Sequence, residues 1–220
     1  LGVTYYRLGD YKDALEALHR AAKLNVAKYQ GPHPADLAFL AMAEYRLGHV
    51  SESANYLQQL RQRLKEPRWA KNAESWMFLR EAEQAAWDLD SRVWNIVQSP
   101  QHTEAEYRQA LHDLEDACRL MPDNGFIINT LGAAQYRLGQ YQEALATLGR
   151  SDKINQPAQH GPYPMDVAFR ALAEYRLGRV AEAKADLKLL RQRMAQDPWS
   201  HKDDFLACFH EVEALLAKAK

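Results

Sequence analysis

The sequence lacks the features that mark several large classes of protein. No apolar run approaches the roughly 20 residues that span a bilayer, and the first residues have no charged and apolar regions of a signal peptide. Its two cysteines, Cys118 and Cys208, form no CxxC and no metal-ligand spacing. We therefore expect no membrane insertion, no disulfide framework and no zinc site, and we expect a reducing, cytoplasmic location.

The chain also lacks an excess of charge of one sign. Twenty-eight Lys and Arg oppose 29 Asp and Glu, which leaves a formal net charge of -1. No overall field would draw such a protein onto nucleic acid or an anionic membrane, so we expect no nucleic-acid partner. With 220 residues, 47% of them hydrophobic, the chain can nevertheless bury a sizeable core.

Motifs of catalysis are missing as well. The eight histidines form no HExxH, no GxSxG surrounds a serine, and there is no glycine-rich loop, HRD or DFG of a kinase. The acidic residues lie mostly on the periodic polar faces of helices, where solvated surface is the ordinary interpretation. We predict no enzyme, no catalytic residues, no cofactor and no metal site.

What the sequence does contain is repetition. The letters YRLG occur four times, at residues 6–9, 45–48, 136–139 and 175–178. Placing residue 131 on residue 1 lays LGAAQYRLGQYQEALATL over LGVTYYRLGDYKDALEAL without a gap, and the register persists as far as Trp199 on Trp69. Residues 1–90 and 131–220 are therefore two copies of one unit, joined by residues 91–130. We call this superposition of the two copies the repeat alignment.

Within each copy the apolar residues recur at helical spacing. Leu1, Tyr5 and Leu8 form one such series, and a second begins at Tyr11. The glycine of YRLG can close the first helix in a left-handed conformation, and acidic or amide residues such as Asp10 can begin the second. Two amphipathic helices should therefore meet at each YRLG.

This pattern resembles the tetratricopeptide repeat. Residues 125–155 carry most of the family's positions, namely Leu131-Gly132, Gly139, Tyr141, Ala144 and Leu148. A helix over residues 104–121 places Tyr107 one repeat length of that family before Tyr141. Val50 and Val180 replace the family's aromatic residue, so those two repeats diverge. The resemblance implies an all-α fold, a solenoid of helical hairpins (an alpha-alpha superhelix) built from two duplicated halves.

The expected organisation has three parts. Residues 1–90 hold a truncated first helix, two hairpins and a closing helix from Trp69 to about Leu89. Residues 91–130 connect the halves. Residues 131–220 repeat the first half and end in a capping helix from Trp199 to about Lys218, whose polar outer face carries His201, Lys202, Asp203, Asp204, Lys218 and Lys220. Because Leu1 opens in the middle of a helix pattern, we expect further residues before it.

The succession of an ACRLMPDNG junction, a full repeat, a Gly-Pro-x-Pro repeat and an RxR-ending helix also resembles repeat regions of planctomycete-type bacterial proteins. Those regions often follow serine/threonine kinase domains. The resemblance implies a protein-interaction or scaffolding module of a larger signalling protein. The alternative is a structural role, either self-association or intramolecular regulation without an external ligand.

The repeat family implies where a ligand would bind, since its first helices line the hollow of the superhelix. The corresponding residues here are the Tyr-Arg pairs and one polar neighbour: Tyr6, Arg7, Tyr45, Arg46, Asn129, Tyr136, Arg137, Tyr175 and Arg176. Tyrosine offers a flat amphipathic surface and arginine a fork of donors, so four pairs could hold an acidic or phosphorylated peptide. Alternatively, the tyrosines pack, the arginines are solvated, and the repetition records only duplication.

Two further patterns have simpler interpretations. The first-helix faces present Val3, Met42, Ala133 and Leu172 where chaperone-binding members of the family use Lys and Asn, so we do not expect a clamp for a chaperone's carboxylate. A basic run ends the fourth expected helix, with Arg61, Arg63, Lys65, Arg68 and Lys71. We predict that this run is a solvated helix end, stabilised by the helix dipole.

Overall fold

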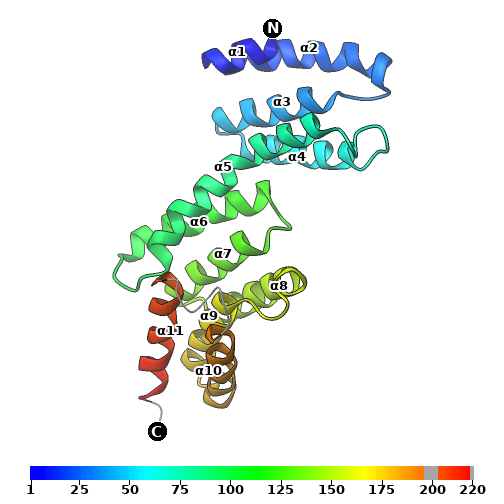
Figure 1. The fold of residues 1–220 in the computed structure, drawn as a ribbon. Helices are drawn as coiled ribbons and strands as arrows, with labels where there is room; N and C mark the ends of the chain where they lie inside the picture. The colour runs from blue at the N-terminus through cyan, green and yellow to red at the C-terminus, as the bar shows by residue number, and fades with distance from the viewer. Residues whose placement is uncertain (196–202, 219–220) are drawn as a thin grey trace. The chain divides into compact units, whose positions relative to one another are not determined.

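The computed structural model describes residues 1–195 and 203–218, and all regular structure in these residues is helical. The prediction of an all-α fold is confirmed. The polar residues His201, Lys202 and Lys220 of the expected cap, with Trp199, lie outside the described residues. The helices, drawn in Figure 1, are α1 (Gly2–Leu8), α2 (Tyr11–Tyr29), α3 (Pro34–Arg46), α4 (Val50–Leu64), α5 (Ala73–Val97), α6 (Glu104–Leu120), α7 (Gly125–Arg137), α8 (Tyr141–Gln159), α9 (Pro164–Arg176), α10 (Val180–Met194) and α11 (Asp203–Leu216).

The chain divides into two compact units. The first unit comprises Leu1–Trp87 and Arg119–Met121, and the second comprises Asp88–Cys118 and Pro122–Lys220. Helix α5 begins in the first unit and ends in the second. This division describes how the helices pack. That residues 1–90 and 131–220 arose by duplication stays a prediction from the sequence.

The helical hairpins of the two units have matching bounds. Under the repeat alignment, α8, α9 and α10 begin and end at the same positions as α2, α3 and α4. In the first unit α2 packs against α1 and α3, and α3 packs against α4. In the second unit α8 packs against α7 and α9, and α9 packs against α10 and α11. The predicted register of the repeat is therefore visible in the helices themselves.

The YRLG glycines end helices, as the sequence predicts. Gly9 and Gly48 have φ values of 89° and 84°, and both Gly139 and Gly178 have 77°. This left-handed region is open to glycine and costs other residues about 1 kcal/mol or more. Each of these four glycines lies between two successive helices, so the prediction of turns at these positions is confirmed.

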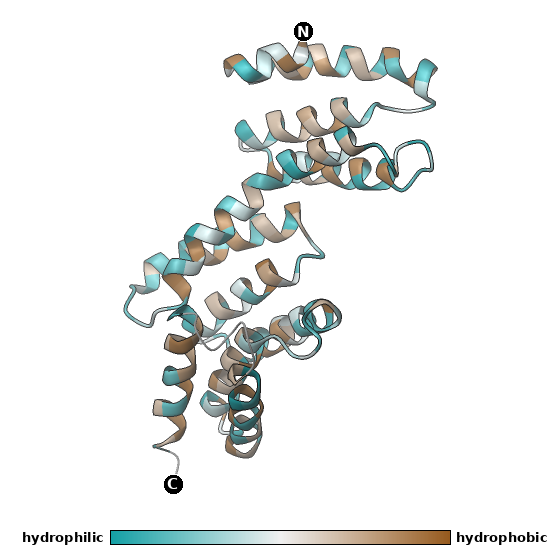
Figure 2. Cartoon of the chain, viewed as in Figure 1, coloured by the Kyte–Doolittle hydropathy of each residue, from teal (hydrophilic) through white to brown (hydrophobic). Residues whose placement is uncertain are grey.

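The Leu-Gly pair of the repeat has a steric reason. A Cβ atom on Gly132 would lie 2.7 Å from Cγ of Leu148, and one on Gly2 would lie 2.6 Å from Cγ of Leu18. Real atoms do not approach so closely, so α7 can lie this near to α8, and α1 to α2, only with glycine at these positions. Figure 2 shows hydrophobic and hydrophilic residues alternating along the helices. The fully buried side chains include Leu37, Leu57 and Leu60 in the first unit and Ile127, Leu148 and Phe169 in the second.

Helix α5 differs from its expected extent. It begins at Ala73, not at Trp69, because the Asn72 side chain accepts a hydrogen bond of 2.8 Å from the Ser75 backbone N–H. Trp69 instead packs against Tyr29 and His33, with ring centroids 5.8 and 4.9 Å apart. The helix continues past Leu89 to Val97. The predicted bounds of this closing helix are therefore wrong at both ends.

Candidate functional site

The first Tyr-Arg pair of each unit lies in an aromatic cluster. In the first unit the Arg7 guanidinium carbon is 5.8 Å from the ring centroid of Tyr6 and 5.4 Å from that of Phe39. In the second unit Arg137 is 5.4 Å from both Tyr136 and Phe169. The two clusters coincide in the repeat alignment, and a guanidinium at such distances is attracted to the faces of the rings.

A glutamate of the closing helix completes each cluster. Arg7 Nη2 lies 2.6 Å from Oε1 of Glu81. Arg137 makes two such bonds with Glu211, of 2.6 Å from Nη1 and 2.7 Å from Nη2. Glu81 and Glu211 again coincide in the repeat alignment. We call the sets Tyr6, Arg7, Phe39 and Glu81, and Tyr136, Arg137, Phe169 and Glu211, the first and second nodes.

The second Tyr-Arg pair of each unit reaches back to its node. A hydrogen bond with the Tyr6 hydroxyl raises the pKa of Arg46, and one with Tyr136 raises the pKa of Arg176. Both arginines are exposed, whereas Tyr45 and Tyr175 are half-buried. Each unit therefore joins its two Tyr-Arg pairs through one tyrosine hydroxyl.

The two nodes differ in exposure. The Arg137 side chain is 4% exposed, because its Nε donates to the Val97 carbonyl at 2.7 Å and its Nη2 donates to the Gln98 carbonyl at 2.9 Å. The Arg7 side chain is 57% exposed and is paired with Glu81. The second node is thus closed by the C-terminal end of α5, whereas no helix end closes the first node among the residues that the structure describes.

Burial sets the charge state of the second node. Desolvation lowers the pKa of Arg137, but the hydrogen bond and charge of Glu211 more than compensate and leave that pKa raised. Burial is also the largest cause of the raised pKa of Tyr136, which the Arg176 hydrogen bond partly offsets. Arg137 is therefore charged and committed to acceptors of its own unit.

The phenylalanine of each node has a different aromatic neighbour. Phe169 meets Trp94, with ring centroids 6.3 Å apart, and Trp94 Nε1 donates to Asp204 at 3.2 Å. Phe39 meets Phe78, with centroids 5.9 Å apart. Phe78 is equivalent in sequence to the small Cys208, so the first unit supplies its own aromatic ring where the second unit uses one from α5.

Asn129 lies in the core of the second unit. It is 2% exposed, and its Nδ2 donates to Asp166 at 2.8 Å. Burial raises the pKa of Asp166 to about 7, against the opposing hydrogen bonds of Ser151, Asn129 and Asn155. The Asn129 side chain is part of this internal network, so the structure does not present it to a ligand.

The arginines of the basic run are structural. Arg61 donates to Glu83 from Nε at 3.0 Å and from Nη2 at 2.7 Å. Arg63, whose side chain is 11% exposed, donates to the backbone carbonyls of Pro32 at 3.1 Å and Tyr29 at 3.0 Å. The prediction of a solvated helix end is therefore wrong for these two residues.

The second unit repeats this arrangement. Arg191 donates to Glu213 at 2.8 and 3.1 Å, and Arg193 donates to the carbonyls of Pro162 at 2.9 Å and Gln159 at 3.0 Å. In both copies the second arginine of RxR holds the loop that contains Gly-Pro-x-Pro. The glycines of these loops, Gly31 and Gly161, have φ values of 146° and 141°, which other residues rarely adopt, and a Cβ atom on either would also lie 3.0 Å from this arginine.

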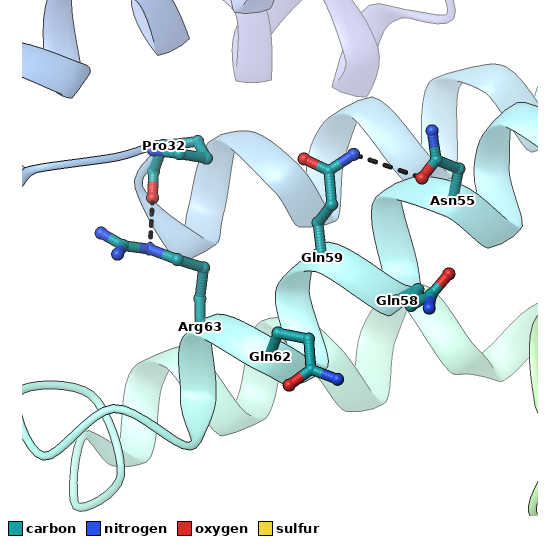
Figure 3. A pocket seen from close by; sticks show the side chains of 6 residues that line it. All are labelled: Pro32, Asn55, Gln58, Gln59, Gln62 and Arg63. Atoms are coloured by element: carbon teal, nitrogen blue, oxygen red, sulfur yellow. Dashed lines mark hydrogen bonds between the residues drawn. The ribbon is translucent and has the colours of Figure 1, made fainter.

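A shallow pocket of about 430 Å³ lies beside Arg63. Figure 3 shows the six side chains that line it, which are Pro32, Asn55, Gln58, Gln59, Gln62 and Arg63. Gln59 Nε2 donates to Asn55 at 3.4 Å, and Arg63 is bonded to Pro32. The lining is thus mostly neutral amide, with its one cation already holding the loop.

Other kinds of site receive no support from the described residues. Within residues 1–195 and 203–218, no group of three or more His, Cys, Asp or Glu could hold a metal ion. No helix of the described chain is both long and apolar enough to cross a membrane. Burial raises the pKa of the Cys118 thiol to about 11 and that of Cys208 to about 12, which disfavours the reactive thiolate.

The repeating helical hairpins, with their glycine turns and close Leu-Gly contact, are consistent with the family that the sequence matches. Residues 1–25 match the family described as Tetratricopeptide repeat. The match and the fold support a tetratricopeptide-repeat protein. Proteins of such repeats are generally non-catalytic interaction modules. None of the curated proteins compared with the chain matches it significantly.

Several solved structures of tetratricopeptide-repeat (TPR) proteins are similar. A thermophilic TPR protein of Thermus thermophilus is 25% identical, with 99% of this chain and 96% of that chain covered and a TM-score of 0.39. The first TPR domain of human RPAP3 is 16% identical, with coverage of 61% and 94% and a TM-score of 0.45. The TPR2AB domain of yeast Sti1, in a complex with pHSP90, is 17% identical, with coverage of 96% and 83% and a TM-score of 0.41.

Proposed function

We propose that this chain is a protein-interaction module and that the first node is part of its binding surface. The geometry of Arg7, whose side chain is 57% exposed among the described residues, is the observation that carries this proposal. A guanidinium that is stacked on two rings and paired with a carboxylate has few conformations left to lose, so binding to it incurs little ordering entropy.

The partner segment presents oxygen acceptors to Arg7 and Arg46. Both arginines belong to the first unit and are linked through Tyr6, whose hydroxyl bonds to Arg46 and whose ring lies beside Arg7. An acidic or phosphorylated peptide would supply carboxylate or phosphate oxygens, and the end of a helix would supply carbonyls. Tyr45 lies beside Arg46 in the sequence and offers further amphipathic surface.

The proposal narrows the site that the sequence suggests. Arg137 and Asn129 are excluded in the folded state, since both side chains are buried and bonded within the second unit. Arg176 and Tyr175 stay candidates for contacts of the second unit. A concave groove shared by all four pairs, a cytoplasmic location and a place in a larger signalling protein belong to the proposal and are supported by sequence resemblance alone.

Binding of acidic peptides tests the proposal. The probe is a set of fluorescent twelve-residue peptides rich in Asp and Glu, each with and without phosphoserine, titrated by anisotropy at 50 and 300 mM NaCl. The double variant Arg7→Gln and Arg46→Gln should weaken binding at least about tenfold, because several exposed contacts of about 0.5–1 kcal/mol act together. Binding should also fall with salt.

Arg20→Gln is the matched control. Arg20 is an exposed arginine of the same unit, paired with Glu16 at 3.2 Å on α2, and its replacement removes one positive charge, as each replacement at the site does. If Arg20→Gln weakens binding as much as the replacements at residues 7 and 46 do, the effect is one of net charge and the proposed site fails. If the double variant binds all of the acidic and phosphorylated peptides as tightly as the unaltered protein does, the proposal is contradicted.

A second candidate function is self-association through α1 and α2. Leu1, Leu8 and Leu24 are 79%, 71% and 77% exposed, which is unusual for large apolar side chains. Sedimentation velocity across a hundredfold range of concentration tests this candidate. A rising sedimentation coefficient that Leu8→Glu abolishes would favour it, whereas a constant monomer would favour binding in trans.

A further inference from the structure

We propose that His33 is a pH-sensitive cap of helix α3, which holds the first turn of that helix while the imidazole is neutral and releases it on protonation. The inference goes beyond the proposed function, because it concerns the regulation of the first unit's own fold and does not require the first node to bind a ligand. The residues that carry it lie within the first unit, between α2 and the start of α5.

The imidazole of His33 caps α3 only in its neutral form. Helix α3 begins at Pro34, which has no N–H, so the N–H of Ala35 is the first backbone donor that needs an acceptor outside the helix. The Nδ1 atom of His33 accepts from this N–H at 3.2 Å. An acceptor at Nδ1 places the proton of the neutral ring on Nε2, and the protonated ring has no acceptor at all. Protonation therefore removes the cap.

Aromatic neighbours hold the His33 ring in this position. Its centroid lies 5.0 Å from that of Tyr29 and 4.9 Å from that of Trp69, both in edge-to-face contact. Cations already lie over the same two rings, since the Arg68 guanidinium carbon is 4.7 Å from Tyr29 and 5.2 Å from Trp69, and Lys28 Nζ is 4.9 Å from Tyr29. An imidazolium would add a third positive charge to this cluster.

Charged groups around His33 act in both directions. They come from every element beside it: Lys28 and Tyr29 from α2, Asp36 from α3, Arg63 from α4, Arg68 from the segment after α4, and Glu74 from α5. Burial has the largest effect and lowers the pKa of His33 below its ordinary 6.5; the two arginines lower it further, whereas the two carboxylates raise it. Because the folded chain holds the proton less well than the unfolded chain, the stability that the cap adds is present above about pH 6.5 and is lost as pH falls.

The loss should be confined to the start of α3. Asp36, in the first turn, accepts a hydrogen bond of 2.6 Å from Asn25 of α2, so loosening the turn weakens one link between these helices. Arg63 holds the preceding loop through the carbonyls of Tyr29 and Pro32 at 3.0 and 3.1 Å, and these bonds do not involve the imidazole. Acid should therefore fray the first turn while the loop stays attached.

The second unit provides a contrast. Tyr163 stands at the equivalent position before α9, and its side chain makes no capping bond. In the same unit α7 is capped by Asn124, whose Oδ1 accepts from the Phe126 N–H at 3.0 Å. A carboxamide does not titrate in this range, so the cap of α7 should not respond to pH.

The test follows His33 and the amide that it caps in the whole ¹⁵N-labelled chain. Nuclear magnetic resonance gives the tautomer and the titration of the imidazole from the shifts of its two nitrogens, and His33→Asn assigns these signals. Amide exchange, divided by the rate of an unstructured peptide at the same pH, gives the protection of Ala35. The amide of Phe126 is the internal control.

At about pH 7.5 the His33 ring should carry its proton on Nε2, and it should titrate below 6.5. The protection of Ala35 should fall about fivefold as His33 titrates, which is the usual effect of losing a helix cap, while that of Phe126 stays constant. His33→Asn keeps a capping side chain without a titration, so Ala35 should stay protected throughout. His33→Tyr, which takes the residue of the second unit and keeps an aromatic ring, should leave Ala35 poorly protected at every pH.

Several results overturn the inference. A proton on Nδ1 at about pH 7.5, or titration of His33 above 6.5, shows that the ring is not the acceptor of a cap. Protection of Ala35 that is unchanged while His33 titrates shows that the cap does not hold the turn. An equal loss of protection in His33→Asn, or at Phe126, assigns the effect to acid in general. The tautomer and the titration are measured on the unaltered protein, so they decide the matter if a variant fails to fold. None of these results involves Arg7, so the proposed function is tested separately.

Discussion

Replacing Arg137 by glutamine should destabilise the second unit far more than the matched replacement of Arg7 destabilises the first. The two arginines are equivalent in sequence and are paired with equivalent glutamates. They differ in burial, since the side chains are 4% and 57% exposed. The pair of variants therefore isolates the effect of closing a node.

The magnitude follows from what each replacement leaves behind. Without Arg137, the Glu211 carboxylate, whose side chain is 22% exposed, and the carbonyls of Val97 and Gln98 lose their partner. Breaking a buried ion pair in this way costs about 3–5 kcal/mol. Without Arg7, an exposed pair is lost, which costs about 0–1 kcal/mol because solvent screens it. The difference between the variants is about 3 kcal/mol.

Native-state hydrogen exchange read by mass spectrometry is the suitable assay, because a chain of two units need not unfold in one step. Arg137→Gln should lower the protection of α7, α9 and α11 about a hundredfold, which corresponds to about 3 kcal/mol. Arg7→Gln should change the protection of α1 and α3 by about fivefold or less. Equal losses in both units, or no loss for Arg137→Gln, would refute the distinction between a closed and an open node.

Three further predictions concern stability and reactivity. Burial raises the pKa of folded Asp166 to about 7, whereas an unfolded Asp titrates near 4, so the folded state binds more protons between these pH values. The free energy of unfolding should therefore fall as pH rises from about 4 to about 7. Asp166→Asn should reduce this dependence on pH in urea titrations, and an unchanged dependence would contradict the burial argument. Gly9→Ala, at a φ of 89°, should destabilise the protein by about 1 kcal/mol, whereas Gly149→Ala, in a helix with open space around it, should stabilise the protein by about 0.5–1 kcal/mol. If both variants change the melting temperature in the same direction, the assignment of the turn at Gly9 is refuted. Cys208, which is buried, should react with a disulfide reagent at pH 8 only on unfolding, and the half-buried Cys118 should react more slowly than a free thiol, since burial raises their pKa values to about 12 and about 11. Rapid reaction of Cys208 in the native chain would contradict its burial.

Much of the fold could be predicted from the sequence because its signals are local. The YRLG turns, the helical spacing and the repeat alignment give the order of the hairpins, and the bounds of α2, α3 and α4 recur in α8, α9 and α10. Local periodicity also favours Trp69 as the start of the closing helix, and this prediction is wrong. In the structure Trp69 packs against Tyr29 and His33, a tertiary contact that periodicity does not show.

The candidate site could be predicted only in part. Repetition points to Arg7 and Arg137, but their difference depends on the carbonyls of residues 97 and 98, which are backbone groups and leave no trace in residue type. The same reason explains the error at Arg63, which bonds to two carbonyls. Glu81 and Glu211 could have been identified from the sequence as candidate partners of the arginines, since the repeat alignment pairs them on the closing helices.

The exchange of the arginine side-chain Nε–H protons tests the central claim most directly. In ¹⁵N-detected nuclear magnetic resonance, the Nε–H of Arg137, bonded to the Val97 carbonyl, should exchange slowly with water, whereas the Nε–H of Arg7 should exchange rapidly. Equally rapid exchange at both arginines, or slow exchange at Arg7 without any ligand, would contradict an open first node and a closed second one.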